Sequence, residues 1–143
     1  MAPEGMVHAL EIVHQLLAPG GLLIDIHPTS EPPTIHVRHL ADEFLAGWLQ
    51  ETDDFIEYRQ ANQAMQQAIQ RGWFSFVTAS EFTFAIHAGS LDELSTYLAS
   101  EWKDAVIPTE AATKIGTLFS EYPQEKEIII TERIHIARYR RID

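Results

Sequence analysis

The stretch His8–Ile26 reads HALEIVHQLLAPGGLLIDI and carries the clearest fold signal in the chain. Apolar residues recur at helical spacing as far as Leu17. The turn Ala18-Pro19-Gly20-Gly21 then ends the helix, because proline cannot continue one and glycine accepts the left-handed backbone of a cap. Leu22–Ile26 follows as a strand, apolar except for Asp25, and such strands are typical of parallel sheets buried on both faces. The stretch therefore predicts an α/β fold with this strand inside it.

The rest of the chain continues in alternating elements. Helices are expected at residues 6–17, 52–71, 90–102 and 109–121, the second starting at the cap residues Thr52 and Asp53 and the third at the capping box Ser90-Leu91-Asp92-Glu93. Strands are expected at residues 73–87, as one long or broken strand, and at 127–140. Residues 40–51 fit either a helix or the return strand of a hairpin, and we favour a β-hairpin over residues 34–50.

The bulk properties describe an ordinary soluble protein. The 143 residues suit a single domain over residues 1–143, and 45% hydrophobic with 22% charged residues is typical of globular chains. No apolar run approaches the roughly 18–20 residues that span a bilayer. The first residues lack a basic region leading into an apolar one, so no secretory signal is expected and a cytoplasmic location is predicted. The absence of cysteine excludes disulfides and thiolate catalysis.

The charge balance is strongly acidic. There are 21 acidic and 10 basic side chains, which give a formal net charge of −11. Proteins that neutralise phosphates carry the opposite balance, at least locally. The only basic concentration comprises Arg133, Arg138, Arg140 and Arg141, as expected for a solvated strand and tail. Neither nucleic acid nor an acidic membrane surface is therefore expected as a partner.

The stretch His8–Ile26 resembles the part of class I S-adenosylmethionine-dependent methyltransferases where a helix leads through a Leu-x-Pro-Gly-Gly turn into the fifth strand. Ala18 stands where that family often has lysine. The expected strands at 74–87 and 127–140 are similar to the family's sixth strand and its antiparallel seventh. The resemblance implies a partial Rossmann-like methyltransferase sheet with helices packed on it. The sheet is mixed because its last strand is antiparallel, and the hairpin at 34–50 is an addition to it.

The same resemblance places this chain in the C-terminal half of the family fold, because the first four strands have no counterpart. In the family, a glycine-rich turn after the first strand holds the cofactor, and glycine is needed because the backbone approaches the ligand closely. No Gly-x-Gly occurs here. The resemblance therefore implies no cofactor-binding residue, no cofactor for the isolated chain and no stand-alone methyltransferase activity. S-adenosylmethionine is expected only if a partner chain supplies the missing half.

The missing fourth strand has a physical consequence. In the family it would pair with the strand Leu22–Ile26, which here becomes an edge. An apolar strand edge without a neighbour favours pairing with another chain. The alternative is that the hairpin Thr34–Leu49 covers this edge. We therefore predict a homodimer, with this edge or the hairpin 34–50 at the interface.

A candidate polar site lies at the end of the same strand. Asp25 and His27 are two residues apart and so share a face, beside the loop where α/β proteins place ligands. His36 or His39 across the hairpin, together with Glu31, would extend the group. The alternative is that these are hydrogen-bonded or exposed side chains without a ligand. No catalytic residue is assigned, and no metal site is predicted, because His36 and His39 are three apart in a strand and point to opposite faces.

Three functions remain open at this point. The first is a non-catalytic, methyltransferase-like module that dimerises or binds a partner. The second is a methyltransferase completed by another chain. The third is a small ligand-binding or metal-binding domain that uses the histidine-rich loop.

Overall fold

The computed structural model describes residues 3–51, 54–122 and 125–143. Within these ranges the chain forms four helices and seven strands. They divide into two compact units: unit 1 comprises Met1–Ser30, Asp53–Phe82 and Ile134–Asp143, and unit 2 comprises Glu31–Thr52 and Thr83–Arg133. The long strands β5 (Phe74–Ala88) and β7 (Lys126–Arg141) supply residues to both units.

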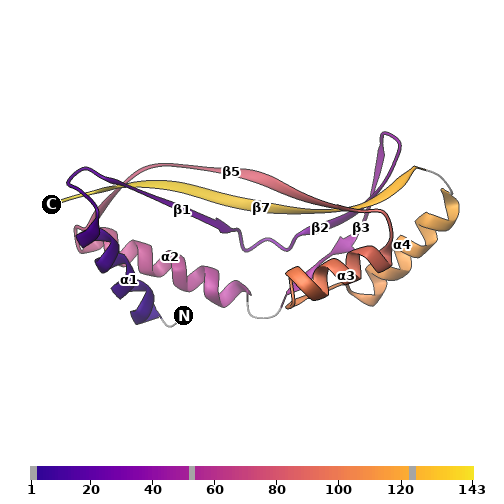
Figure 1. Cartoon of the computed structure of the whole chain (residues 1–143), viewed down its shortest axis with the longest axis horizontal. Helices are drawn as coiled ribbons and strands as arrows, with labels where there is room; N and C mark the ends of the chain where they lie inside the picture. Colours follow the sequence, from indigo (N-terminus) through magenta and orange to yellow (C-terminus); the bar gives the residue numbers. More distant parts are fainter. Residues whose placement is uncertain (1–2, 52–53, 123–124) are drawn as a thin grey trace. The chain divides into compact units, whose positions relative to one another are not determined.

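Unit 1 combines two helices with an antiparallel sheet. Its elements are α1 (Pro3–Leu16), β1 (Leu22–Pro28), α2 (Asp54–Gln70), the first part of β5 and the last part of β7. β1 pairs with β7 without a register shift, from Leu22 opposite Arg140 to Pro28 opposite Ile134. β5 also pairs with β7. Both helices lie on the same side of these strands (Figure 1).

The core of unit 1 lies between the two helices and one face of its strands. Leu23 of β1 points into it, and its partners are Leu10, Val13, Leu17, Met65, Ala68, Trp73, Phe74, Ala137 and Tyr139. The turn before β1 has the predicted geometry. Gly20 adopts a φ of +74°, and the Gly21 amide donates to the Ala18 carbonyl at 2.8 Å. Because the chain reverses direction here, β1 packs against α1 and α2.

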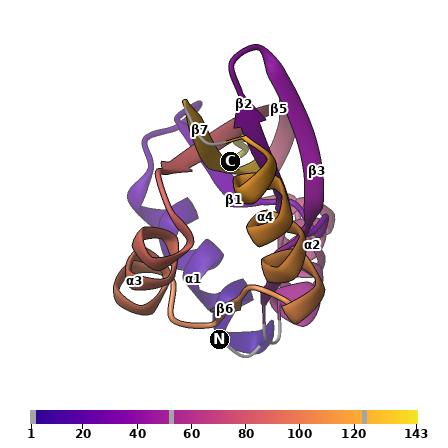
Figure 2. The same cartoon turned by 90° about the vertical axis from the view of Figure 1, so that its right-hand side faces the viewer.

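Unit 2 is built on the predicted hairpin. β2 (Thr34–His39) and β3 (Asp42–Trp48) form its arms, which Figure 2 shows joined by a short turn. β2 also pairs antiparallel with the first part of β7. The hairpin over residues 34–50 is therefore confirmed, and a helix at 40–51 is wrong. The remaining elements are α3 (Leu91–Glu101), α4 (Thr109–Glu121) and a small sheet of β4 (Gln50–Glu51) with β6 (Ala105–Val106).

The core of unit 2 is the larger one. It comprises Ile35, Val37, Ala46, Leu49, Ala88, Leu94, Leu98, Ala111, Ile115, Leu118, Ile128 and Ile130. The predicted cap of α3 is present, because the Ser90 hydroxyl accepts from the Glu93 amide at 3.1 Å. The Glu93 carboxylate accepts from the amide of Gly89 at 2.9 Å, one residue earlier than a capping box requires.

The mixed α/β class and the antiparallel last strand are confirmed, but the expected environment of β1 is wrong. β1 pairs antiparallel, and alternate residues along it are exposed. The physical reason is that both helices of unit 1 pack on the Leu23 face, so neither covers the opposite one. β5 forms one continuous strand, not a broken one. The predicted cap residues Thr52 and Asp53 lie outside the described residues.

None of the described helices is both long enough and apolar enough to cross a membrane.

Candidate functional site

β1 presents two chemically different faces. Its burial alternates residue by residue up to His27. Asp25 and His27 lie on the helix-covered side together with Leu23, because the side chains of a strand alternate between its faces. Leu22, Ile24 and Ile26 lie on the opposite side, and we call these three residues the aliphatic face. One short strand therefore contributes both the candidate polar site and an exposed apolar surface.

Asp25 and His27 make the contact that their spacing predicted. The Nδ1 atom of His27 lies 3.0 Å from Oδ1 of Asp25, and the two side chains are 16% and 29% exposed. An ionised carboxylate only accepts hydrogen bonds, so Nδ1 is the donor and Nε2 is left for another partner. Asp25 also acts on Tyr139: burial raises the pKa of the Tyr139 phenol, and the negative charge of Asp25 raises it further.

The described structure adds His135 to this pair. His135 of β7 lies directly opposite His27 of β1, and the two imidazole centroids are 5.0 Å apart with a tilt of 44°. Tyr58 of α2 stacks near His27, with centroids 6.3 Å apart and planes at 22°. His135 is not one of the five predicted site residues. Its position between Ile134 and Ile136 in an alternating strand predicts which face of that strand it occupies. The residue opposite it depends on the register between β1 and β7, which the alternation does not specify.

A cleft of about 520 Å³ opens beside the two imidazoles. Its walls come from the end of β1 and the loop after it, from α2, from β5 and from β7. Most of its lining side chains are polar, namely His27, Thr29, Ser30, Tyr58, Arg59, Asn62, Gln63, Gln66, Glu81 and His135. Side chains that donate and accept hydrogen bonds in this number suit a small hydrophilic ligand.

The other predicted site residues belong to unit 2 and make different contacts there. Glu31 pairs with Arg133, with an Oε2 to Nη1 distance of 3.0 Å. His39 stacks on Tyr122, with ring centroids 4.3 Å apart. His36 lies opposite Ile129 of β7. Of the five predicted residues, Asp25 and His27 are thus in contact, and Glu31, His36 and His39 are engaged elsewhere.

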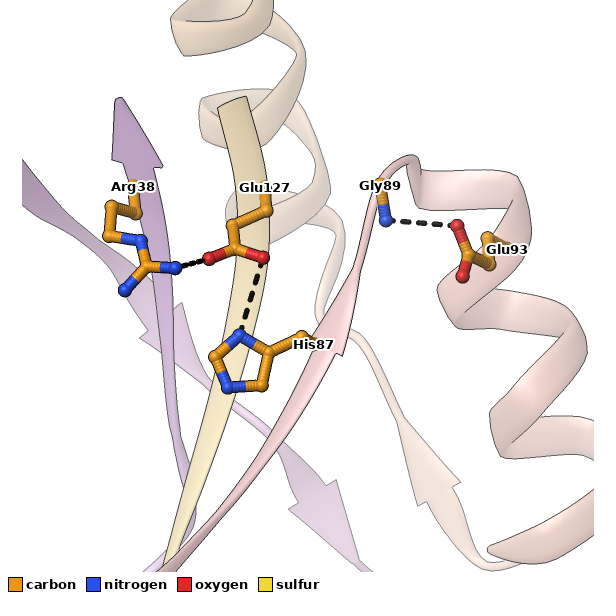
Figure 3. A network of polar contacts seen from close by, with 5 residues as sticks. All are labelled: Arg38, His87, Gly89, Glu93 and Glu127. Atoms are coloured by element: carbon orange, nitrogen blue, oxygen red, sulfur yellow. Dashed lines mark hydrogen bonds and ion pairs between the residues drawn. The ribbon is translucent and has the colours of Figure 1, made fainter. Parts of the chain in front are cut away.

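The sheet of unit 2 carries charges on the face that is turned away from its core. Arg38 of β2 donates to Glu127 of β7, and the second Glu127 oxygen lies 3.3 Å from Nδ1 of His87 on β5 (Figure 3). Ile128 and Val37, the neighbours of this group on β7 and β2, point into the core. This is the ordinary pattern of an antiparallel sheet with one face in water.

The aliphatic face of unit 1 departs from that pattern. Leu22, Ile24 and Ile26 are 42%, 56% and 57% exposed. Like the charged residues of unit 2, they lie on the face of the strands that is turned away from the core of their unit. Single exposed apolar residues are common on protein surfaces, but here three of them form a row on one strand.

β1, β3 and β5 each pair with one strand among the described residues, and the edges of β1 and β3 differ. β1 pairs with β7 and with no other strand among the described residues. It has no bulge, and its first proline is Pro28 at its very end. β3, one edge strand of unit 2, begins with Asp42 and Glu43, and its pairing with β2 shifts register at Ile35/His36. Charges and bulges protect a sheet edge from pairing with other chains, so β3 is protected and β1 is open.

No group of three or more histidine, aspartate or glutamate side chains suited to a metal ion occurs in the part of the chain that the structure describes. Comparisons with protein-family models, with curated proteins and with solved structures found no match to this chain.

Proposed function

We propose that this chain is a partner-binding module that forms a homodimer through the open edge of β1. The observation that carries the proposal is the row Leu22, Ile24 and Ile26, exposed on a strand that has a single pairing partner among the described residues. Each unpaired backbone amide and carbonyl on such an edge is available to a neighbouring strand. The proposal assigns no catalytic activity to the isolated chain.

A second copy fits this edge for reasons of symmetry and charge. Two β1 strands that run antiparallel across a two-fold axis offer each other the same donors and acceptors, which is the isologous contact typical of homodimers. Asp25 is the only acidic side chain on β1, and its carboxylate is engaged by His27. Pairing would also place the aliphatic rows of the two copies side by side, which shields part of their surface from water.

The resemblance to methyltransferases offers a second candidate, a chain that supplies the cofactor-binding half and pairs with the same edge. What supports it is the order of the strands: β1 and β5 both pair with β7, as the resemblance implies for the fifth, sixth and seventh strands. The two candidates differ in what the purified chain does alone, since only the first requires self-association.

Sedimentation equilibrium at high micromolar concentration tests the proposal. We expect a dimer for the unmodified chain and a monomer for Ile24→Glu, because a charge in the row opposes its burial. The matched control is Ile56→Glu, since Ile56 on α2 is 59% exposed, much like Ile24. The control variant is expected to remain dimeric. A monomeric unmodified chain, or a dimer that tolerates Ile24→Glu, would overturn the proposal.

A further inference from the structure

We propose that His27 and His135 form a binding site for a divalent transition-metal ion at the wall of the cleft in unit 1. The site lies within one chain and does not depend on the proposed dimer. The protein supplies two imidazole ligands, and the remaining coordination positions face the cleft, where water or a small ligand occupies them. Three features support this site: the spacing of the two rings, the contact that orients His27 and the chemistry of the cleft lining.

The spacing of the rings suits a shared ion. A metal–nitrogen bond of about 2.1 Å places the ion roughly 3.2 Å from the centre of each imidazole ring. Two such rings that meet at an angle between square and tetrahedral have centroids about 4.5–5.2 Å apart. The centroids of His27 and His135 are 5.0 Å apart. Because the two residues are directly opposite in an antiparallel pair, the backbone itself holds this spacing.

Asp25 orients the first ligand. Its carboxylate accepts from Nδ1 of His27 at 3.0 Å, which leaves Nε2 with a free lone pair for a metal ion. A carboxylate behind a metal-binding histidine fixes the tautomer and raises the basicity of the ligand nitrogen. A histidine that merely fills space on a sheet does not require such a partner.

His135 has no competing polar contact. Its imidazole contacts the ring of His27, and it makes no hydrogen bond or ion pair with any residue that the structure describes. Both of its nitrogens are therefore available to water or to an ion. A shared metal ion would use one nitrogen of each imidazole as a ligand.

The ligand set defines the class of metal. Imidazole favours zinc, nickel and copper, whereas magnesium and calcium prefer sets of oxygen ligands. The open positions face Asn62, Gln63 and other hydrogen-bonding side chains of the cleft. An ion held there by two protein ligands keeps exchangeable positions, so a small anionic or hydroxylated ligand would bind to the metal and to the cleft together.

Titration of the full chain with Cu²⁺ and Zn²⁺ tests this proposal. We expect one ion per chain by calorimetry, and Cu²⁺ spectra by electron paramagnetic resonance that report two nitrogen ligands. His27→Gln or His135→Gln should abolish the tight site, and Asp25→Asn should weaken it by about tenfold, as outer-shell changes do. His36→Gln, the matched control in unit 2, should bind like the unmodified chain, and Mg²⁺ should not bind.

Ile24→Glu distinguishes failure of the metal site from failure of the proposed dimer. This variant is expected to be monomeric and to keep the metal site. Each of the following results would overturn the proposal: no stoichiometric binding by the unmodified chain, a copper spectrum with fewer than two nitrogen ligands, or loss of the site in Ile24→Glu. Circular dichroism of each variant confirms that it is folded. The copper spectrum of the unmodified chain needs no variant and decides the matter even if one fails to fold.

Discussion

Ile24 of β1 lies directly opposite Arg138 of β7, and both side chains are exposed on the face of unit 1 away from its helices. In unit 2 the corresponding cross-strand pair joins Arg38 to Glu127, two opposite charges. An aliphatic side chain thus stands where a carboxylate would complete an ordinary solvent-facing pair. The proposed interface explains why, since a charge at this position would oppose the burial of the row.

The first prediction uses this pair. Opposite charges directly across an antiparallel pair stabilise a sheet, and like charges destabilise it, each by about 0.2–1 kcal/mol. The free energy of unfolding of Ile24→Glu should therefore exceed that of Ile24→Lys by roughly 0.5–1 kcal/mol. Both variants are expected to be monomeric, so association does not bias the comparison. Urea denaturation measures the difference, and equal stability of the two variants would show that Arg138 does not interact with position 24.

The second prediction concerns the core of unit 1. Phe74 is fully buried beside Met65 and Tyr139, whereas Phe82 on the same strand is 46% exposed. Phe74→Ala should lower the free energy of unfolding by about 3–5 kcal/mol, since it removes buried surface and leaves a cavity. Phe82→Ala should cost less than about 1 kcal/mol. If the two losses were similar in denaturant titrations, the difference in burial between Phe74 and Phe82 would be wrong.

The third prediction concerns the cap of α3. The Ser90 hydroxyl satisfies the Glu93 amide, which has no partner within the helix. Ser90→Ala should cost about 1 kcal/mol, the usual value of an N-cap hydrogen bond. Ser100→Ala near the other end of α3 is the control, because its hydroxyl contacts only the exposed side chain of Glu101. Thermal unfolding should distinguish the two variants, and an equal effect would contradict the role of the cap.

The fourth prediction is a pH dependence. Burial and then the charge of Asp25 raise the pKa of Tyr139 above 10.0. A raised pKa means that the unfolded chain loses this proton first. The stabilising contribution is therefore complete below pH 10 and is lost as the pH rises through the folded-state pKa. Absorbance at alkaline pH should show one tyrosine that ionises after the others, and Asp25→Asn should lower its pKa. An unchanged titration in that variant would exclude the Asp25 contribution.

Most elements of the fold could be predicted from periodicity and caps. The hairpin β2–β3, the helix that begins after Ser90 and the turn at Gly20 follow from local signals, because each depends on residues close together in the chain. The environment of β1 could not be predicted in this way. The apolar run Leu22–Ile26 is compatible both with a strand buried on both faces and with a strand that has one exposed apolar face.

The candidate site was partly predictable for the same reason. Asp25 and His27 are two residues apart on one strand, so their shared face follows from the sequence alone. His135 comes from β7, and its place opposite His27 depends on the register of two strands that are distant in sequence. His36 and His39 lie in the hairpin of unit 2, and the local pattern could not tell which unit would contain them.

Cysteine cross-linking can detect pairing of β1 with β1 of a second copy, because the chain has no native cysteine. Directly opposite residues in an antiparallel pair have Cα atoms about 4.5–5.5 Å apart, within the range of a disulfide. Leu22→Cys, Ile24→Cys and Ile26→Cys should be compared with Ile56→Cys under mild oxidation. We expect a covalent dimer for at least one β1 position, formed much faster than in the Ile56→Cys control. Dimer formation no faster than that control at all three positions would contradict it.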